Sequence, residues 1–238
     1  MKEKLYTIPV TDAFKQTCEC PLCALRQNLE DHAIEYTLGS SYMEDDVRAV
    51  TDQKGFCANH IKLLYQNQNR LGLALILNSH INKTIQDLEH ISSHAKPTPK
   101  QLFKKTADTN ELTSYISSLS SSCFVCEQID HTFERYLVTI FHLYKTQPDF
   151  KQILHSSYGF CTSHYGTLYK MAPQNLNGST LTDFNTTLTK LYLDHMKRVK
   201  ADLDWFIDKF DYRNSKEPWR NSKDALLRSI TKTNGVLL

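Results

Sequence analysis

An eleven-residue pattern with one cysteine and one histidine occurs twice in this chain. GFCANHIKLLY spans residues 55–65 and GFCTSHYGTLY spans residues 159–169, so Gly-Phe-Cys-x-x-His-x-x-x-Leu-Tyr recurs after 104 residues. Each copy also follows a Cys-x-x-Cys pair at nearly the same distance, with 33 residues between the pairs in the first half and 34 in the second. A duplication of pairs and spacing is hard to explain by chance, and it constrains the fold more than any other feature.

The residue types in these pairs predict two tetrahedral metal sites. Close pairs of Cys and His that are separated by a structured segment are typical of such sites, because each turn supplies two ligands. Zinc suits three thiolates and one imidazole, since it accepts soft sulfur and nitrogen in tetrahedral geometry. We therefore expect two Cys₃His sites and two zinc ions per chain, with these ligands: Cys20, Cys23, Cys57, His60, Cys123, Cys126, Cys161 and His164.

The sequence constrains which residues are ligands more tightly than it constrains which Cys-x-x-Cys shares a site with which Cys-x-x-His. Residues i and i+3 at the start of a helix share one face, and the helix N-terminus favours the thiolate form. We expect each half of the chain to hold its own site. Crossed pairing, in which the Cys-x-x-Cys of one half joins the Cys-x-x-His of the other, satisfies the same spacing and stays open. Four protein ligands leave no place for a substrate, so the sites are expected to be structural.

Three other interpretations of the cysteines stay open. They could be buried thiols and core histidines without metal, redox pairs, or ligands of an iron–sulfur cluster. No thioredoxin-like pattern of strands surrounds either Cys-x-x-Cys, which argues against the redox pair. Cys18 is the one cysteine left over, and Ser121 occupies its position in the second half. We therefore expect Cys18 to be a spare or substitute thiol.

Helical periodicity dominates the remaining sequence. Only 7 of the 238 residues are glycine and 7 are proline, which favours long helices over a turn-rich β fold. We expect an all-α fold, a pseudo-duplicated helical bundle with two Cys₃His zinc knuckles. The predicted segments are an extended arm at residues 6–9, helices over residues 24–37, 44–50, 58–93 and 180–210, and a last helix with Ser222 as N-cap and Gly235 after its end.

Composition also indicates where domains begin and end. Residues 95–110 hold two prolines among polar residues, which is typical of a linker. We predict a first metal-binding helical repeat at residues 1–94, a linker at 95–111, a second metal-binding repeat at 112–212 and a helical tail at 213–238.

The tail combines aromatic and basic residues. Ten Lys/Arg and six Asp/Glu lie from residue 197 to the end, although the whole chain has a net charge of only +2. Such residues can anchor an unknown protein or nucleic-acid partner, or the aromatics can simply close the core. The aromatics are Trp205, Phe206, Phe210, Tyr212 and Trp219, and the cations interleaved with them are Lys209, Arg213, Arg220 and Arg228.

The start of the chain has no apolar segment typical of a secretory signal, and no stretch is long and apolar enough to predict a membrane helix. We therefore expect a cytoplasmic protein that does not insert into membranes. Cysteines in that compartment are more often metal ligands or redox thiols than structural disulfides.

The chain resembles an uncharacterised domain-of-unknown-function family of Gram-positive bacteria. The matching segments are YTIPVTDAF, ECPLC, MEDDVR, both GFCxxH copies, and KFDYRN with the following PW and KDALLR. The resemblance spans nearly the whole chain outside the linker, and it implies no activity.

The function that these features favour is a non-enzymatic zinc-binding module that acts through interactions or regulation. One alternative is a thiol-based redox or metal sensor that releases zinc on oxidation, with Cys18 as an extra thiol. A second alternative is an enzyme with a cleft near Asp211, Arg213 and Trp219. No phosphate-binding loop, HExxH or GxSxG motif supports an enzyme.

Overall fold

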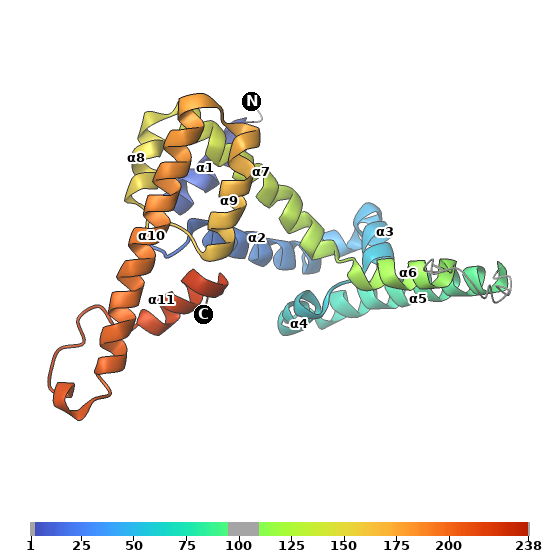
Figure 1. Ribbon diagram of the computed structural model, residues 1–238. Helices are drawn as coiled ribbons and strands as arrows, with labels where there is room; N and C mark the ends of the chain where they lie inside the picture. The colour runs from blue at the N-terminus through green and yellow to red at the C-terminus, as the bar shows by residue number, and fades with distance from the viewer. Residues whose placement is uncertain (1–2, 95–109, 238) are drawn as a thin grey trace, which may run out of the picture. The chain divides into compact units, whose positions relative to one another are not determined.

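The computed structural model describes residues 3–94 and 110–237, and within these ranges all regular structure is helical (Figure 1). The expected all-α fold is therefore confirmed. Eleven α-helices and two 3₁₀ turns follow one another without a strand in the described ranges: α1 Glu3–Lys15, α2 Pro21–Leu38, η1 Ser40–Met43, α3 Asp45–Lys54, α4 Ala58–Gln66, α5 Arg70–His94, α6 Glu111–Ser121, α7 Phe124–Thr146, α8 Pro148–Ser156, α9 Thr162–Asn175, α10 Gly178–Asp208, η2 Tyr212–Asn214 and α11 Ala225–Asn234.

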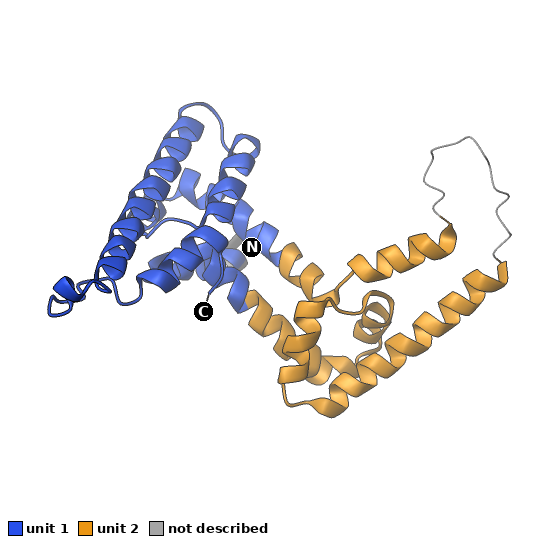
Figure 2. Cartoon of the chain, turned by 60° about the horizontal axis from the view of Figure 1, so that its bottom comes forward, with its two compact units in different colours: residues 1–28, 132–238 blue, residues 29–131 orange. Residues whose placement is uncertain are grey.

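The helices form two compact units (Figure 2). Unit 1 combines residues 1–28 with residues 132–238, and unit 2 consists of residues 29–131. Helices α2 and α7 each contribute residues to both units. The boundaries predicted from composition, 1–94 and 112–212, do not coincide with these units, because the units divide the chain by tertiary contact. Of the predicted linker 95–111, all but the last two residues lie outside the described residues.

Unit 1 has a core rich in aromatic side chains. Phe14 from α1 packs edge-on against Phe150 and Phe160, with ring centroids 5.2 and 5.8 Å apart. Phe184 from α10 packs against Tyr144 of α7 at 4.9 Å. All five rings are almost completely buried. Each such ring removes a large apolar area from water and favours the edge-to-face geometry seen here. These contacts therefore join α1 to α8 and α7 to α10.

Helix α1 corrects the prediction of an extended arm at residues 6–9. The segment is helical although Pro9 lies inside it. Proline costs a helix interior one hydrogen bond. The cost is offset by burial of the apolar face that follows, where Val10, Ala13 and Phe14 are 0–2% exposed. Tertiary packing therefore outweighs local propensity at this site.

Unit 2 has a smaller core built mainly from aliphatic side chains, including Ile34, Leu64, Ile76 and Val125. Helix α3 packs along α5, where Asp52 accepts a hydrogen bond from the Ser79 hydroxyl at 2.5 Å. The single helix predicted over residues 58–93 is wrong, because the chain breaks between α4 and α5.

The break between α4 and α5 has a local cause. The side-chain oxygen of Asn69 accepts the backbone N–H of Gly72 at 2.9 Å and so caps the new helix. Asparagine is a preferred residue at this position, since its side chain replaces a hydrogen bond that the first turn lacks. The sequence therefore carried this signal within an otherwise continuous helical pattern.

The C-terminal helix α11 packs on both α10 and α9. Gly235 ends it in the left-handed conformation with φ of 71°, as predicted for the residue after a helix. The predicted N-cap is wrong. Ser222 lies three residues before the first residue of the helix, where its hydroxyl donates to the carbonyl of Trp219 at 2.7 Å.

No helix in the described part of the chain is both long enough and apolar enough to cross a membrane.

Candidate metal centres

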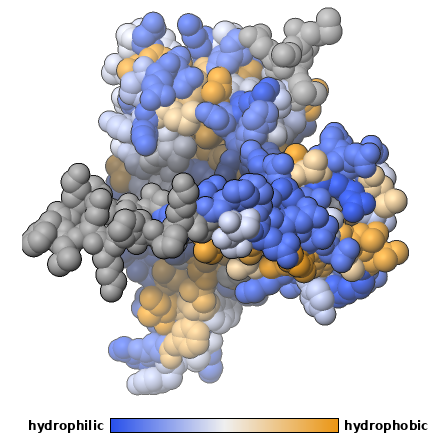
Figure 3. Space-filling view, turned by 90° about the vertical axis from the view of Figure 1, so that its right-hand side faces the viewer, coloured by the Kyte–Doolittle hydropathy of each residue, from blue (hydrophilic) through white to orange (hydrophobic). Residues whose placement is uncertain are grey.

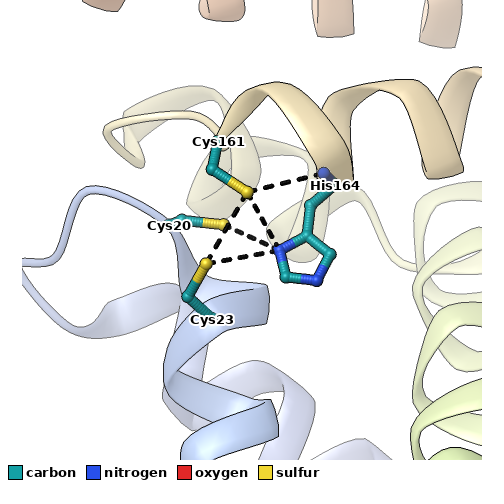
Figure 4. Close-up of side chains that lie close together, drawn as sticks. All are labelled: Cys20, Cys23, Cys161 and His164. Atoms are coloured by element: carbon teal, nitrogen blue, oxygen red, sulfur yellow. Dashed lines mark hydrogen bonds between the residues drawn. The ribbon is translucent and has the colours of Figure 1, made fainter. Parts of the chain in front are cut away.

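Four predicted ligands meet in unit 1, at the first turns of α2 and α9. Cys20, Cys23, Cys161 and His164 point their ligand atoms toward one another (Figure 4). The Nδ1 atom of His164 lies 3.4 Å from the sulfurs of Cys20 and Cys23 and 3.2 Å from that of Cys161. The sulfurs of Cys23 and Cys161 are 3.6 Å apart. All four ligand atoms therefore surround one point.

The local sequence explains this arrangement. Pro21 begins α2 directly after Cys20, because its fixed φ suits the first helical position. Cys161 has extended dihedrals, φ −72° and ψ 164°, at the N-cap of α9. Its sulfur accepts the backbone N–H of His164 at 3.5 Å, which orients both side chains on one face of the helix.

The unit 1 cluster is well shielded from water. Cys20, Cys23 and Cys161 are 0%, 4% and 0% exposed. Hydrogen bonds with Cys20 and Cys23 hold the pKa of the Cys161 thiol below its ordinary value. Burial lowers the pKa of His164, but hydrogen bonds with Cys161 and Cys20 outweigh it and raise this pKa to about 9. The sulfurs therefore stabilise a positive charge on the neighbouring imidazole.

The other four predicted ligands meet in unit 2, where α4 and α7 begin. Cys57, His60, Cys123 and Cys126 form the second group. The Nδ1 atom of His60 lies 3.3 Å from each of the three sulfurs. The sulfurs of Cys57 and Cys126 are 3.9 Å apart.

Backbone contacts join the two segments of the unit 2 cluster. The N–H of Phe124 donates to the carbonyl of Gly55 at 3.0 Å, and the Ser122 hydroxyl donates to the carbonyl of Lys54 at 2.7 Å. Gly55 has φ of 60°, and a Cβ there would lie 2.8 Å from Nε2 of His80. The glycine of the repeated motif is therefore needed for its conformation, and a larger residue would also displace the His80 ring.

The two clusters differ in what lies behind the histidine. In unit 2, a carboxylate oxygen of Glu30 lies 2.9 Å from Nε2 of His60. In unit 1, the ring of His164 lies 5.4 Å from the ring of Phe133. The unit 2 cluster is also less shielded, because Cys57 and Cys126 are half-buried.

In the unit 2 cluster, hydrogen bonding likewise favours a protonated imidazole beside a thiolate. The hydrogen bond with Cys123 outweighs burial and raises the pKa of His60 to about 9. Burial raises the pKa of Cys123, but hydrogen bonds with His60 and with backbone N–H groups lower it to about 6. Cys123 is therefore predisposed to the thiolate form that a metal ligand needs.

All eight residues predicted from sequence are brought together, in two groups whose ligand atoms lie within 4.8 Å of one another. The expectation that each half of the chain holds its own site is wrong, and the crossed pairing is found. The first Cys-x-x-Cys joins the second Cys-x-x-His in unit 1, and the second Cys-x-x-Cys joins the first Cys-x-x-His in unit 2. Either group could hold a metal ion.

Cys18, the cysteine predicted to be spare, belongs to neither group. It is half-buried, and burial raises the pKa of its thiol. It lines a polar cavity of about 560 Å³ together with Glu19 and Arg198. The position of Cys18 outside both clusters agrees with the presence of Ser121 at the matching position of the second half.

A buried network of ion pairs and hydrogen bonds connects α11 to the segments next to the unit 1 cluster. The sequence did not indicate this network. The Lys232 ammonium, 1% exposed, donates to the carbonyl of Glu19 at 2.6 Å and to the carbonyl of Tyr158. The Glu19 carboxylate accepts from Arg198 at 2.6 Å. Neither Glu19 nor Glu30 has a local motif, because each acts through residues that are distant in the chain.

The tail residues, for which partner binding and core closure were both left open, divide into two sets. The ammonium of Lys209 is held by three backbone carbonyls, those of Asn214, Ser215 and Glu217. Phe210 and Tyr212, in contrast, are 75% and 85% exposed. The core-closing interpretation therefore does not apply to these two aromatics.

Arg228 reaches outside the tail, because its guanidinium donates to Asp202 at 2.8 Å and lies 3.9 Å from the carboxylate of Glu19. Other tail contacts are local. Arg220 lies over the Trp205 ring at 3.9 Å, and Phe206 packs near Trp219 at 5.9 Å. Asp211 and Arg213, two of the residues named for the alternative of an enzyme cleft, form an ion pair with each other at 2.6 Å.

The chain belongs to a family of unknown function, DUF6062, whose model matches residues 1–238. Comparison with curated proteins and with solved structures found no match.

Proposed function

We propose that this protein is a non-enzymatic zinc-binding interaction module, in which two Cys₃His zinc sites hold the helices in place. The observation that carries the proposal is the convergence of eight dispersed residues into two groups with the same donor set. Three sulfurs and one imidazole nitrogen are the ligands that zinc prefers in structural sites.

The distances support a single zinc ion in each group. With Zn–S of about 2.3 Å and Zn–N of about 2.0 Å, a tetrahedral site places two sulfurs about 3.8 Å apart and sulfur and nitrogen about 3.5 Å apart. The observed separations are 3.6 and 3.9 Å for sulfur pairs and 3.2–3.4 Å for sulfur–nitrogen pairs. An iron–sulfur cluster places several atoms between its ligands and needs wider separations, so zinc is preferred.

A structural role follows from the number of ligands. Each site has four protein ligands, whereas a catalytic zinc keeps one position for water or substrate. Each site also fastens a residue pair near the start of one helix to a pair near the start of another, so metal binding energy becomes folding energy. Thiolate ligands persist in a reducing compartment, and we therefore place the protein in the cytoplasm.

Metal analysis of reduced, chelator-free protein tests the proposal. We expect about two zinc ions per chain, and we expect a chelator to lower helical content measured by circular dichroism, since the sites contribute to folding. Cys57→Ser should remove one zinc, and Cys18→Ser is the matched control that should keep both. Protein that is folded and contains no zinc would rule out the proposed function.

A second candidate, a redox sensor, is favoured by the half-buried thiols of Cys57 and Cys126. Hydrogen peroxide oxidises two thiolates to a disulfide and, with two protons from solvent, is reduced to two water molecules; loss of the two ligands releases the metal. A chromogenic zinc indicator should then detect about one zinc released per chain at low peroxide, from unit 2 first. Release that needs a large excess of peroxide would exclude this role.

A further inference from the structure

A hydrophobic groove lies on unit 2, where α4 and α5 meet. Its volume is about 390 Å³, and its surface is almost entirely apolar. The residues that line it are Ile61, Lys62, Tyr65, Gln66, Leu73 and Leu77. Apolar side chains of α5 outside the groove are also exposed, with Leu71 at 67% and Ile81 at 56%. Figure 3 displays a face of the molecule on which hydrophobic residues lie exposed among hydrophilic ones.

The groove rests on fixed elements. Ile61 and Leu77 pack against the buried core of unit 2, so the floor of the groove belongs to that core. The guanidinium of Arg70 lies 3.8 Å from the centre of the Tyr65 ring, which is 62% exposed, and holds this ring at the edge. Helix α4 begins directly after Cys57 and carries His60 in its first turn, and both residues belong to the unit 2 cluster. A preformed groove loses little conformational entropy when a partner binds.

Along the stretch of α4 and α5 that lines the groove, the charged side chains have one sign. From Gly55 to Gln86 the chain has three Lys/Arg and no Asp or Glu. Lys83 is paired with Asp87, which leaves Lys62 and Arg70 as the cations beside the groove. No carboxylate is among the lining residues. A partner that places carboxylates beside an apolar stripe is therefore complementary to this surface.

We propose that the α4–α5 groove binds an acidic amphipathic helix of a partner protein. Amphipathic helices are recognised by laying their apolar face into a groove between helices, with apolar anchors at positions i, i+3, i+4 and i+7. Tyr65, Leu73 and Leu77 contact these anchors, and Lys62 and Arg70 pair with acidic residues that flank them. This inference rests on the proposed function, since it names the kind of partner that the interaction module binds.

The test uses the full chain and two synthetic probes. One probe is a fluorescein-labelled 18-residue helical peptide with leucine at the anchor positions and glutamate elsewhere, and the second has lysine in place of each glutamate. Fluorescence anisotropy should show the acidic peptide binding at least about ten-fold more tightly than the basic one. Lys62→Glu should weaken binding of the acidic peptide and strengthen binding of the basic peptide. Tyr65→Ala should weaken binding of both peptides.

Matched controls separate this inference from the proposed function. Leu226→Ala, an equally apolar change at a side chain of unit 1 that is 49% exposed, should leave binding unchanged. Zinc is measured in the same samples. Binding of both peptides with equal affinity, or no effect of Lys62→Glu in protein that keeps its zinc, would overturn the groove proposal alone. Concentration-dependent self-association that Tyr65→Ala abolishes would also overturn it, because a second copy would then be the occupant.

Discussion

A carboxylate oxygen of Glu30 lies 2.9 Å from Nε2 of His60, on the side of the imidazole that faces away from the three cysteine sulfurs. In the neutral ring, this hydrogen bond places the single N–H proton on Nε2 and leaves Nδ1 available as a metal ligand. Carboxylates in this position fix the orientation of a metal-binding histidine and raise its basicity. His164 has the Phe133 ring as its neighbour instead, so the two sites are supported differently.

Glu30→Gln should therefore weaken zinc binding in unit 2. We expect a loss of affinity of about 10- to 100-fold at this site and no change at the unit 1 site. Competition with a zinc chelator of known affinity measures both sites in one titration. Glu35→Gln, an exposed glutamate on the same helix, is the matched control. Equal weakening of both sites would contradict the separate roles.

Crossed pairing makes a distinct prediction for double variants. Cys57→Ser combined with Cys126→Ser removes two ligands of one site, so about one zinc should remain per chain. Cys57→Ser combined with Cys23→Ser damages both sites, so zinc should be nearly absent. Pairing within each half of the sequence predicts the opposite result. Elemental analysis of the two purified proteins decides between the two arrangements.

Lys232→Met should destabilise unit 1. The change removes the cation that holds two carbonyls and lies 3.3 Å from the carboxylate of Glu19. We expect a loss of about 2–4 kcal/mol in the free energy of unfolding, since buried acceptors lose their donor while Glu19 keeps its arginine partner. Denaturant titration followed by circular dichroism measures it. Lys200→Met, at an ammonium that is 73% exposed, should change this free energy by less than about 0.5 kcal/mol.

The titration of His195 should make unit 1 less stable in mild acid. Burial, and then the charges of Lys232 and Arg198, lower its pKa below the ordinary value of 6.5. Nδ1 of the ring accepts a hydrogen bond from Arg198, as only the neutral ring can. The folded state therefore binds this proton less readily than the unfolded state. The contribution of neutral His195 to the free energy of unfolding is fully present above pH 6.5. It is lost as the pH falls from 6.5 toward the pKa of His195 in the folded state.

The measurement for His195 is a difference between proteins. Melting temperatures of wild type and His195→Gln are compared from pH 7.5 to pH 5, because protonation of metal ligands affects both proteins alike. The variant should lose less stability on acidification than wild type does. Parallel curves would show that His195 is protonated equally well in the folded and unfolded chain.

The sequence predicted which residues form the two Cys₃His clusters but not which of them meet. Cys-x-x-Cys and Cys-x-x-His each arise from one turn, so local spacing reveals them. The 33- and 34-residue intervals fit either pairing, since only the packing of helices decides it. Glu30 was missed for the same reason, because it lies on α2 and acts on a histidine of α4.

Helices with strong hydrophobic periodicity were predicted correctly. The predictions failed where tertiary packing or a single capping residue determines where a helix begins or ends. The long α10 agrees with the prediction over residues 180–210 within two residues at each end. Pro9 lies in a helix because the residues after it are buried. Asn69 ends one helical pattern and caps the next, a signal that hydrophobic periodicity alone overlooks.

The crossed arrangement nests one unit inside the sequence of the other, and this sets an order of events on the ribosome. Cys23 and its partner Cys161 are 138 positions apart, whereas His60 and Cys123 are 63 apart. At typical rates of synthesis, about 7–28 s pass between the translation of Cys23 and that of Cys161. The first cysteine pair to be synthesised is thus the last to have its partner residues available. The inserted unit can finish folding before those partners have been translated.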